Sequence, residues 1–260
     1  MKRIGLIGFG FIGAQVYARI QSRPELGLAI AFVHNRSTSR LAALPRALVL
    51  EDLARMPECE LVIEMAHPDY TRRYGEAILA HASYLPLSVT ALADDRLLER
   101  LTARAAACST HLAIPHGALM GLDNLHEWRH MWAEVEITFE KHPASLDFSE
   151  SGIDPAAITG RTLVYEGAVR GIAARFPRNV NTMVTCALAT IGLDRCRARL
   201  IADPSLSMAV AAVSAVGVDG SRLTMRKEQP MAGVSGTEMF ESQFASIQRA
   251  ANARAPLEFV

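Results

Sequence analysis

Apolar runs of strand length alternate with segments of helical periodicity over the first 116 residues of the chain. The runs predict buried strands at residues 4–7, 28–33, 47–50, 59–67, 84–90 and 111–115. Apolar residues at helical spacing predict helices at residues 14–23, 37–44, 51–56, 70–81 and 94–108. Strands that alternate with helices indicate an α/β fold with a doubly wound parallel sheet, whose ligand would lie at the carboxyl ends of the strands.

A different pattern begins after residue 116. Val135, Ile137 and Phe139 alternate with polar residues, which is typical of a half-exposed antiparallel strand. Further strands are predicted at residues 161–165, 197–203, 208–216 and 221–227, with helices at residues 167–175 and 179–191. The second half is therefore predicted to be an α+β domain whose antiparallel sheet is covered by helices on one face. The open face would suit subunit pairing, so we expect a homodimer.

Composition and charge indicate which class of binding partner to expect. Half of the 260 residues are hydrophobic, which is enough for a substantial core, and 27 basic residues balance 27 acidic ones. A chain with zero net charge has no global field that attracts nucleic acid or an anionic membrane, so we expect a small-molecule partner. No apolar run approaches the roughly 20 residues that span a bilayer, and we expect a cytoplasmic protein.

Neither the cysteines nor the histidines form a metal-ligand pattern. The four cysteines are widely spaced, without a C-x-x-C pair, and suit buried reduced thiols. His126 and His130 share one helical face by their spacing but lack a third ligand. We therefore expect no metal site.

A glycine turn follows the first strand. Gly8, Gly10 and Gly13 have the G-x-G-x-x-G spacing where a helix should begin, within a β-α-β unit of about 30 residues. Gly8 would permit the tight turn, Gly10 would let a pyrophosphate approach the backbone, and Gly13 would let the helix pack on the strand. The phosphates would bind N–H groups at the start of this helix, where Phe11 and Ile12 lie. These features indicate a Rossmann dinucleotide-binding turn; the alternative is a glycine-rich turn that binds nothing.

The glycine turn and the change in periodicity together give the domain organisation. Residues 1–116 are the predicted dinucleotide-binding domain, and residues 117–236 are the predicted substrate and dimerisation domain. Residues 237–260 form a C-terminal segment. Its amphipathic helix, at residues 237–252, is expected to pack back on the first domain.

The end of the second strand bears on the choice of cofactor. NAD-binding units usually place an acidic residue about 20 residues past the glycines, whereas an arginine accommodates the 2′-phosphate of NADP. Residues 34–37 contain no carboxylate. Asn35 could bond a ribose hydroxyl, and Arg36, backed by Ser37 and Arg40, could hold a phosphate. We therefore favour NADP, or the use of both NADP and NAD, with a solvated basic loop as the alternative.

Other strand ends would complete the site. Ala66 and His67 follow the strand at residues 59–67, and we expect them to face the cofactor. Residues 88–91 and 115–117 lie at the ends of the next two predicted strands. His67 is a weak candidate for proton transfer, because a structural histidine would also suit this position.

Several separate motifs resemble those of the L-aspartate dehydrogenases, over nearly the whole chain. In the first domain they are the glycine turn, Glu64-Met-Ala66, residues 87–94 and residues 115–123. In the second domain they are residues 154–158, Arg161, residues 165–168, residues 176–181, residues 188–194 and residues 202–204. The resemblance implies reversible, NAD(P)-dependent oxidative deamination of L-aspartate to oxaloacetate and ammonia through iminosuccinate.

The resemblance also implies roles for particular residues. It places cofactor contacts at Ala118 and Asn181, and the amide of Asn181 could act in catalysis by orienting the carboxamide or the substrate without titrating. A helix cap is the alternative role for Asn181, because residues 179–181 precede a helical run. Lys141 would lie near the site and attract a substrate carboxylate, although a lysine that ends an exposed strand is more often solvated.

The sequence departs from the family at three places. Ala209 and Ala211 replace the asparagine and the histidine of a family Asn-x-His segment, and an alanine methyl transfers no proton. His116 stands where the family usually has a small hydroxyl residue. Residues 234–236 replace the family's Asn-Pro-Lys.

Three interpretations of these departures stay open. His116 could take over proton transfer as a catalytic residue, since the unperturbed pKa of histidine, about 6.5, suits that role. The protein could instead reduce another imine or carbonyl, whose chemistry needs no base at Ala211. It could also be an NAD(P)-binding protein with little or no dehydrogenase activity. For His116 itself, the alternative is a hydrogen-bonded structural histidine at a domain junction.

Overall fold

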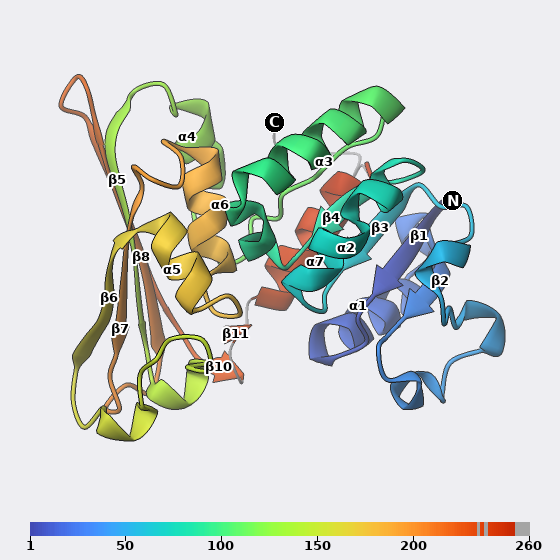
Figure 1. The fold of residues 1–260 in the computed structure, drawn as a ribbon, viewed down its shortest axis with the longest axis horizontal. Coiled ribbons are helices and arrows are strands. Elements are labelled where there is room, and N and C mark those ends of the chain that lie inside the picture. The colour runs from blue at the N-terminus through green and yellow to red at the C-terminus, as the bar shows by residue number, and fades with distance from the viewer. Residues whose placement is uncertain (233–234, 237–238, 253–260) are drawn as a thin grey trace. The chain divides into compact units, whose positions relative to one another are not determined.

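The computed structural model describes residues 1–232, 235–236 and 239–252, which form two compact units (Figure 1). The first unit contains Met1–Pro115 and the chain from Gln243 onward, and the second contains His116–Ser242. Each unit has its own main sheet. Of the predicted C-terminal helix, the described part is α7 (Met239–Ala250). Val234, in the third departure from the family, lies outside the described residues.

A four-stranded parallel sheet, ordered β2-β1-β3-β4, forms the centre of the first unit. Its strands are β1 (Lys2–Ile7), β2 (Leu28–His34), β3 (Leu61–Glu64) and β4 (Ser83–Pro86). The α-helices between and after the strands are α1 (Phe11–Ser22), α2 (Pro68–Leu79) and α3 (Asp95–Cys108). The strand order reverses between β1 and β3, so right-handed crossovers put α1 and α2 on opposite faces. The predicted doubly wound α/β fold is confirmed.

The strands of this sheet are buried on both faces. Ile4, Leu6 and Ile7 of β1 have no exposed surface. Parallel strands that helices cover on both sides need apolar residues at successive positions rather than at alternate ones, which explains the continuous apolar runs in this half of the sequence. α7 also contributes here, because the guanidinium of Arg19 in α1 lies 5.0 Å from the ring centroid of Phe244.

Short segments between these elements differ from the predicted ones. The predicted strand at residues 84–90 ends at Pro86, because its partner strand β3 ends at Glu64, the residue opposite Pro86. A 3₁₀ helix, η5 (Val89–Ala93), follows. The predicted strands at residues 47–50 and 111–115 are single bridges, Val33 with Val49 and Tyr84 with Leu112. Further 3₁₀ helices are η1 (Pro24–Leu26), η2 (Thr38–Leu41), η3 (Arg46–Leu48) and η4 (Leu53–Arg55).

A five-stranded sheet, ordered β6-β7-β5-β8-β9, forms the second unit together with three α-helices. The strands are β5 (Trp132–Lys141), β6 (Thr162–Ala168), β7 (Arg197–Ala202), β8 (Ala209–Gly217) and β9 (Arg222–Gln229). The helices are α4 (Leu122–Glu127), α5 (Val169–Arg175) and α6 (Asn181–Ala189), with 3₁₀ helices η6 (Pro143–Ser145) and η7 (Pro155–Ala157). A separate two-stranded ladder joins β10 (Met231–Ala232) to β11 (Ser235–Gly236).

One strand pair corrects the prediction that the second sheet is antiparallel. β5 and β7 run parallel, with Phe139 opposite Leu200, whereas the other three neighbouring pairs are antiparallel. The sheet is therefore mixed. Alternation of apolar and polar residues indicates that one face is covered, but it carries no information on strand direction. The direction of β7 follows from the long connection through β6, α5 and α6.

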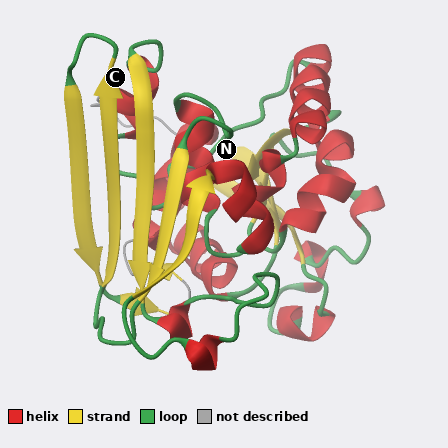
Figure 2. Ribbon diagram, turned by 60° about the vertical axis from the view of Figure 1, so that its left-hand side comes forward, coloured by secondary structure: helices red, strands yellow, loops and turns green. Residues whose placement is uncertain are grey.

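Helices cover one face of this sheet, as Figure 2 shows. Val135, Ile137 and Phe139 of β5 are buried, as their alternation predicted. The opposite face carries polar side chains, among them the half-buried Thr138 and the exposed Ser214. The two faces of the sheet therefore differ in polarity, in agreement with the period-two pattern of the sequence.

The described residues contain no group of three or more His, Cys, Asp or Glu side chains that could hold a metal ion. The four cysteines are reduced, and Cys59, Cys186 and Cys196 are buried. Burial raises the pKa of the Cys59 thiol to about 11, so it stays protonated at neutral pH. None of the helices within the described ranges has the length and apolar character needed to cross a membrane.

Candidate functional site

The glycine turn connects β1 to α1, and two of its glycines are required by the protein itself. Gly8 has a φ of 99°, and a Cβ there would lie 2.7 Å from the carbonyl oxygen of Met65. At Gly13 a Cβ would collide with the carbonyl oxygen of Gly8. These contacts bring the start of α1 against β1, as the sequence predicted for a close helix-to-strand turn.

Gly10 is a glycine for a different reason. Its backbone has a φ of −84°, which any residue can adopt, and a Cβ there would meet only the guanidinium nitrogen Nη1 of Arg40, at 3.9 Å. Packing within the described protein therefore does not demand a glycine. Gly10 is also the N-cap of α1, with no side-chain cap, so the N–H groups of Phe11 and Ile12 are available to a ligand. This open cradle fits a pyrophosphate.

Asn35 lies beside the turn, but its amide group is engaged with the backbone. Its Oδ1 accepts a hydrogen bond from the N–H of Phe9 at 3.0 Å, and its Nδ2 donates to the carbonyl of Ser37 at 2.9 Å. Asn35 therefore holds the end of β2 against the glycine turn. Sequence reasoning missed this bracing role, because it joins residues 26 positions apart.

Two exposed arginines follow β2 in the chain. Arg36 comes directly after Asn35, and Arg40 in η2 reaches the space above Gly10. The ring of His34 is hydrogen-bonded to the backbone, with Nδ1 2.9 Å from the carbonyl oxygen of Leu50. The glycine turn therefore has the cationic side chain of Arg40 beside it and no carboxylate from the end of β2.

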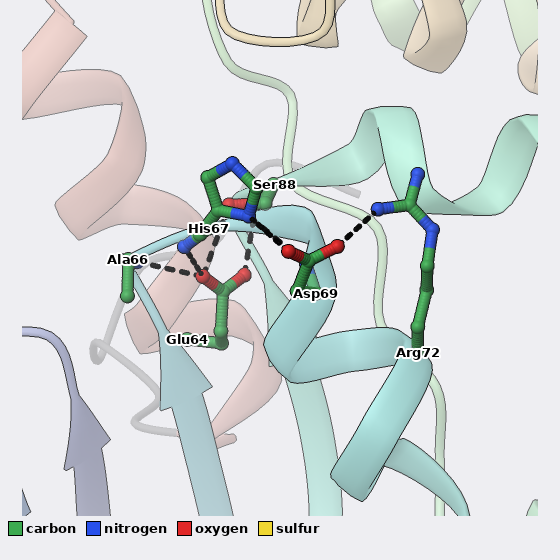
Figure 3. A network of polar contacts seen from close by, with 6 residues as sticks. All are labelled: Glu64, Ala66, His67, Asp69, Arg72 and Ser88. Carbon is green, nitrogen blue, oxygen red and sulfur yellow. Dashed lines mark hydrogen bonds and ion pairs between the residues drawn. The ribbon is translucent and has the colours of Figure 1, made fainter. Parts of the chain in front are cut away.

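Glu64, the last residue of β3, is a fully buried carboxylate. Figure 3 shows the hydrogen bonds that it accepts. Its Oε1 accepts hydrogen bonds from the N–H of Ala66 at 2.6 Å, the N–H of His67 at 2.7 Å and the hydroxyl of Ser88 at 3.0 Å. Its Oε2 accepts from the N–H of Ser88 at 3.2 Å. Burial raises the pKa of Glu64 to about 7, although the hydrogen bonds oppose this shift. The sequence offered one signal, a lone acidic residue at the end of an apolar strand.

Ala66 and His67 are exposed at the carboxyl end of β3, where the sequence placed them. The imidazole of His67 caps α2, because its Nδ1 accepts a hydrogen bond from the N–H of Asp69 at 3.3 Å. Asp69 in turn pairs with Arg72 at 2.7 Å, as Figure 3 shows. The structure thus supports the alternative interpretation of His67 as a structural histidine.

In the second unit, the segment around Ala118 is bound to the start of α6. The N–H of Ala118 donates to Oγ1 of Thr182 at 3.1 Å, and a Cβ on Gly117 would lie 3.0 Å from the same oxygen. The hydroxyl of Ser242 donates to the carbonyl of Gly117. Thr182 directly follows Asn181, so the two residues implied as cofactor contacts, Ala118 and Asn181, are brought together.

Asn181 is the first residue of α6, and the cap residue before it is Val180. The alternative role of Asn181 as a helix cap is therefore wrong. The neighbouring Asn179 takes a structural role instead: its Oδ1 accepts from the N–H of Asp147 at 2.8 Å, and its Nδ2 donates to the carbonyl of Ser145 at 3.2 Å. Asn179 is buried, whereas Asn181 is half-buried.

His116 begins the second unit. Its side chain is 24% exposed, and Nε2 lies 3.9 Å from a carboxylate oxygen of Asp123. This carboxylate is too far for a hydrogen bond. His116 therefore has access to solvent and an acidic neighbour, and it precedes the segment that Thr182 holds.

Ala211, at the position of the family's histidine, is a buried residue of β8. It lies opposite Phe139 of β5 and opposite Lys227 of β9, so these three side chains share one face of the sheet. Lys141 is on the same face as Phe139, with Nζ 5.2 Å from its ring centroid. Only 8% of Lys141 is exposed, so its interpretation as a solvated lysine is wrong.

Asp203 lies next to Lys141 in the second sheet. Its N–H donates to the carbonyl of Lys141 at 2.9 Å. Its Oδ1 accepts from the hydroxyl of Ser205 at 2.6 Å and from the N–H of Ser205 at 2.9 Å. These hydrogen bonds lower the pKa of Asp203, which stays ionised at neutral pH.

Two family models match successive parts of the chain. The model described as homoserine dehydrogenase, NAD binding domain, matches residues 8–115. The model described as aspartate dehydrogenase, C-terminal, matches residues 124–240. Together they cover the glycine turn, the ends of the strands of the first sheet, and the segment from α4 to α7.

A solved structure, aspartate dehydrogenase from Thermotoga maritima, has the same fold, with a TM-score of 0.78, 24% identity and full coverage of both chains. An engineered D-amino acid dehydrogenase bound to NADP⁺ is more distant, with a TM-score of 0.52 and 14% identity over 96% of this chain and 90% of that one. At these identities the likeness concerns the fold alone.

Named relatives are closer in sequence. An L-aspartate dehydrogenase from Methanosarcina mazei is 32% identical over 88% of this chain and 89% of its own length. L-aspartate dehydrogenase 1 from Bordetella pertussis is 35% identical over 84% of this chain and 83% of its own length. An aspartate dehydrogenase domain-containing protein from Xenopus tropicalis is 36% identical over 78% of this chain and 75% of its own length. The chain belongs to the aspartate dehydrogenase family.

Proposed function

We propose that this protein is an NAD(P)-dependent dehydrogenase that interconverts a small amino acid and its 2-oxo acid, with L-aspartate and oxaloacetate as the first pair to test. The observation that carries the proposal is Gly10, whose missing side chain serves no contact in the described protein but leaves a cradle for a pyrophosphate. Membership of the family supports the amino-acid substrate.

The glycine turn and the end of β3, both in the first unit, would hold the phosphates and the ribose of the cofactor. The N–H groups of Phe11 and Ile12 would bind the pyrophosphate above Gly10, and Ala66 and His67 would border the nucleotide at the end of β3. Ala118 and Asn181 would contact the nicotinamide end, and the Asn181 amide would orient the carboxamide or the substrate. The cofactor, when bound, supplies the hydride chemistry.

Two residues of the second unit would handle charge and protons. Lys141, which is buried except for 8% of its surface, would attract a substrate carboxylate more strongly than a solvated lysine could, because its surroundings screen it less. His116 would exchange a proton with the substrate nitrogen in place of the histidine that Ala211 replaces.

The preferred cofactor is proposed to be NADP(H). Arg40 lies beside Gly10 and Arg36 directly follows Asn35 in the chain, while the end of β2 offers no carboxylate to a ribose 2′-hydroxyl. Asn35 supports this preference, since its amide already binds the backbone of Phe9 and Ser37. A 2′-phosphate would then meet two guanidinium groups.

The protein is proposed to act as a homodimer that pairs through the sheet face opposite the helices of the second unit. Sedimentation of the full chain should give a dimer, and Ser214→Arg, at an exposed position of this face, should shift it towards the monomer. Thr102→Arg, on an exposed position of α3, is the matched control and should stay dimeric. A wild-type monomer would refute this arrangement.

The substrate is tested by following NADPH and NADH oxidation with oxaloacetate plus ammonium, beside a panel of other 2-oxo acids with ammonium and of carbonyls without it. Turnover with oxaloacetate supports an aspartate dehydrogenase, and turnover with another compound identifies a different substrate. If His116 transfers the proton, His116→Gln should lower kcat by about 100-fold.

A second candidate function follows from Ala209 and Ala211, which offer no proton-transferring group on β8. It is an NAD(P)-binding protein with little or no dehydrogenase activity. Cofactor binding by calorimetry without hydride transfer to any of the panel would support it, and His116→Gln would then bind the cofactor like the wild type.

A further inference from the structure

The carboxylate of Glu64 connects two loops that follow neighbouring strands. Ala66 and His67 follow β3, whereas Ser88 follows β4, which is hydrogen-bonded to β3 in the sheet. Both loops lie at the carboxyl edge of the first sheet. Ligands of doubly wound sheets bind at this edge, next to the point where the strand order reverses, which here is between β1 and β3.

The four hydrogen bonds to Glu64 suit an anion. Three of the donors are backbone N–H groups, which cannot reverse their direction, and only the Ser88 hydroxyl can turn to accept. A protonated carboxyl would place a hydrogen among these donors and lose at least one bond. Protonation would therefore loosen one of the two loops.

We propose that Glu64 is a positioning residue for the nicotinamide nucleotide: as a carboxylate it fixes the backbone of Ala66, His67 and Ser88 in the conformation that binds the cofactor. This inference rests on the proposed function, because it assumes that the cofactor lies at this edge. Glu64 itself is fully buried and acts through the loops, without touching the cofactor. Cofactor affinity should accordingly fall when Glu64 becomes protonated.

The pH range of this effect lies near neutrality. Burial raises the pKa of Glu64 to about 7, and each pH unit below that value reduces its ionised fraction by up to tenfold. The tyrosines that act on it electrostatically are Tyr84 of β4 and Tyr70 of α2. Burial raises the pKa of both phenols, so neither titrates in this range. His67 donates its backbone N–H to Glu64. The experiment must therefore distinguish an effect of His67 on cofactor binding from the effect of Glu64.

The test compares NADPH dissociation constants of the full-length wild type and of Glu64→Gln, by calorimetry from pH 6 to pH 8.5. Glutamine copies the shape of the protonated side chain and does not titrate. We expect the variant to bind about tenfold more weakly at pH 8.5, and the ratio of the two constants to approach one at pH 6. Titration of the 2′-phosphate cancels in this ratio, because both proteins bind the same ligand.

Three further variants complete the experiment. Glu76→Gln, an exposed carboxylate of α2 that pairs with Arg100 at 2.7 Å, is the matched control and should bind NADPH like the wild type at every pH. His67→Gln should keep the pH dependence, whatever its affinity. Ser88→Ala removes one donor to Glu64, so the midpoint of the pH dependence should move to higher pH. It provides the test if Glu64→Gln does not fold.

The outcomes separate this inference from the proposed function. A wild type that binds NADPH with the same affinity from pH 6 to pH 8.5, or a ratio that does not vary with pH, overturns the role of Glu64 and leaves the dehydrogenase proposal intact. Loss of the pH dependence in His67→Gln overturns it as well. A wild type that binds neither NADPH nor NADH at any pH overturns the proposed function, and this inference with it.

Discussion

At the residue scale, two glycines of the turn between β1 and α1 differ in what surrounds them. Gly8 has a positive φ and lies against the carbonyl of Met65, whereas a Cβ on Gly10 would meet only one nitrogen of Arg40, at 3.9 Å. The first glycine is therefore needed for folding. The second leaves space for a ligand.

Alanine at these two positions should have opposite effects. Gly10→Ala should change the free energy of unfolding by less than about 1 kcal/mol but weaken NADPH binding by at least tenfold, because the methyl group occupies the pyrophosphate cradle. Gly8→Ala should lose on the order of 1–3 kcal/mol of stability from its positive φ. Denaturant unfolding and calorimetry measure these effects. Wild-type NADPH affinity in Gly10→Ala would contradict a pyrophosphate at this position.

Arg36 should determine the preference between the two cofactors. Its removal in Arg36→Ala should raise the dissociation constant of NADPH by about 10- to 100-fold, through loss of a charge-assisted hydrogen bond to the 2′-phosphate, and leave that of NADH nearly unchanged. Arg46→Ala, an exposed arginine of η3 that pairs with Glu51, is the control and should change neither. Equal losses for the two cofactors would argue against a phosphate contact.

At the element scale, long-range hydrogen bonds within each unit attach loops to helices and strands. Asn35 joins the end of β2 to the glycine turn, Glu64 joins the loops after β3 and β4, and Thr182 of α6 holds Ala118. These bonds position backbone groups of loops that have no regular structure of their own. Rigid elements thus fix the conformation of these loops within each unit.

Thr182 offers a direct test of this arrangement. Thr182→Val keeps the shape of the side chain but leaves the buried N–H of Ala118 without its acceptor, which should cost about 1–3 kcal/mol of unfolding free energy and lower kcat. Thr182→Ser keeps the hydroxyl and should retain kcat. If the valine variant matches the wild type in stability and rate, the bond has no role in holding this segment.

The strands of the structure agree only in part with those predicted from the apolar pattern of the sequence. The runs that became β1, β2 and β3 were recognised because buried parallel strands are continuously apolar. The run at residues 84–90 was too long, because the neighbouring strand β3 ends at Glu64, opposite Pro86. The pattern also missed the parallel pairing of β5 with β7, since alternation records burial and not direction.

At the scale of the whole molecule, Glu64 couples folding to pH. Burial raises its pKa in the folded protein to about 7, above its ordinary value of 4.5, so between these values the folded state keeps a proton that the unfolded state has lost. The free energy of unfolding should therefore decrease as the pH rises from 4.5 to 7, by on the order of 3 kcal/mol from this group.

Denaturant unfolding at pH 5 and pH 8 measures this contribution as the difference between the wild type and Glu64→Gln. The wild type should lose more stability than the variant over this range. An identical loss in both proteins would mean that Glu64 titrates near its ordinary value. The ionised form of Glu64 thus lowers the free energy of unfolding while it orders the two loops. Binding of the cofactor would offset this loss of stability.

The sequence by itself determined the class of the fold, the glycine turn and the family, because these depend on local spacing and on periodic burial. Its motifs named Gly8, Gly10, Ala118 and Asn181, but not what holds them. Only the tertiary structure decided which side chains brace the site, since Glu64 meets Ser88 across 24 positions and Ala118 meets Thr182 across 64. It also decided that Lys141 is buried beside Phe139. Such contacts are set by how strands and helices pack, which no local pattern in the chain records.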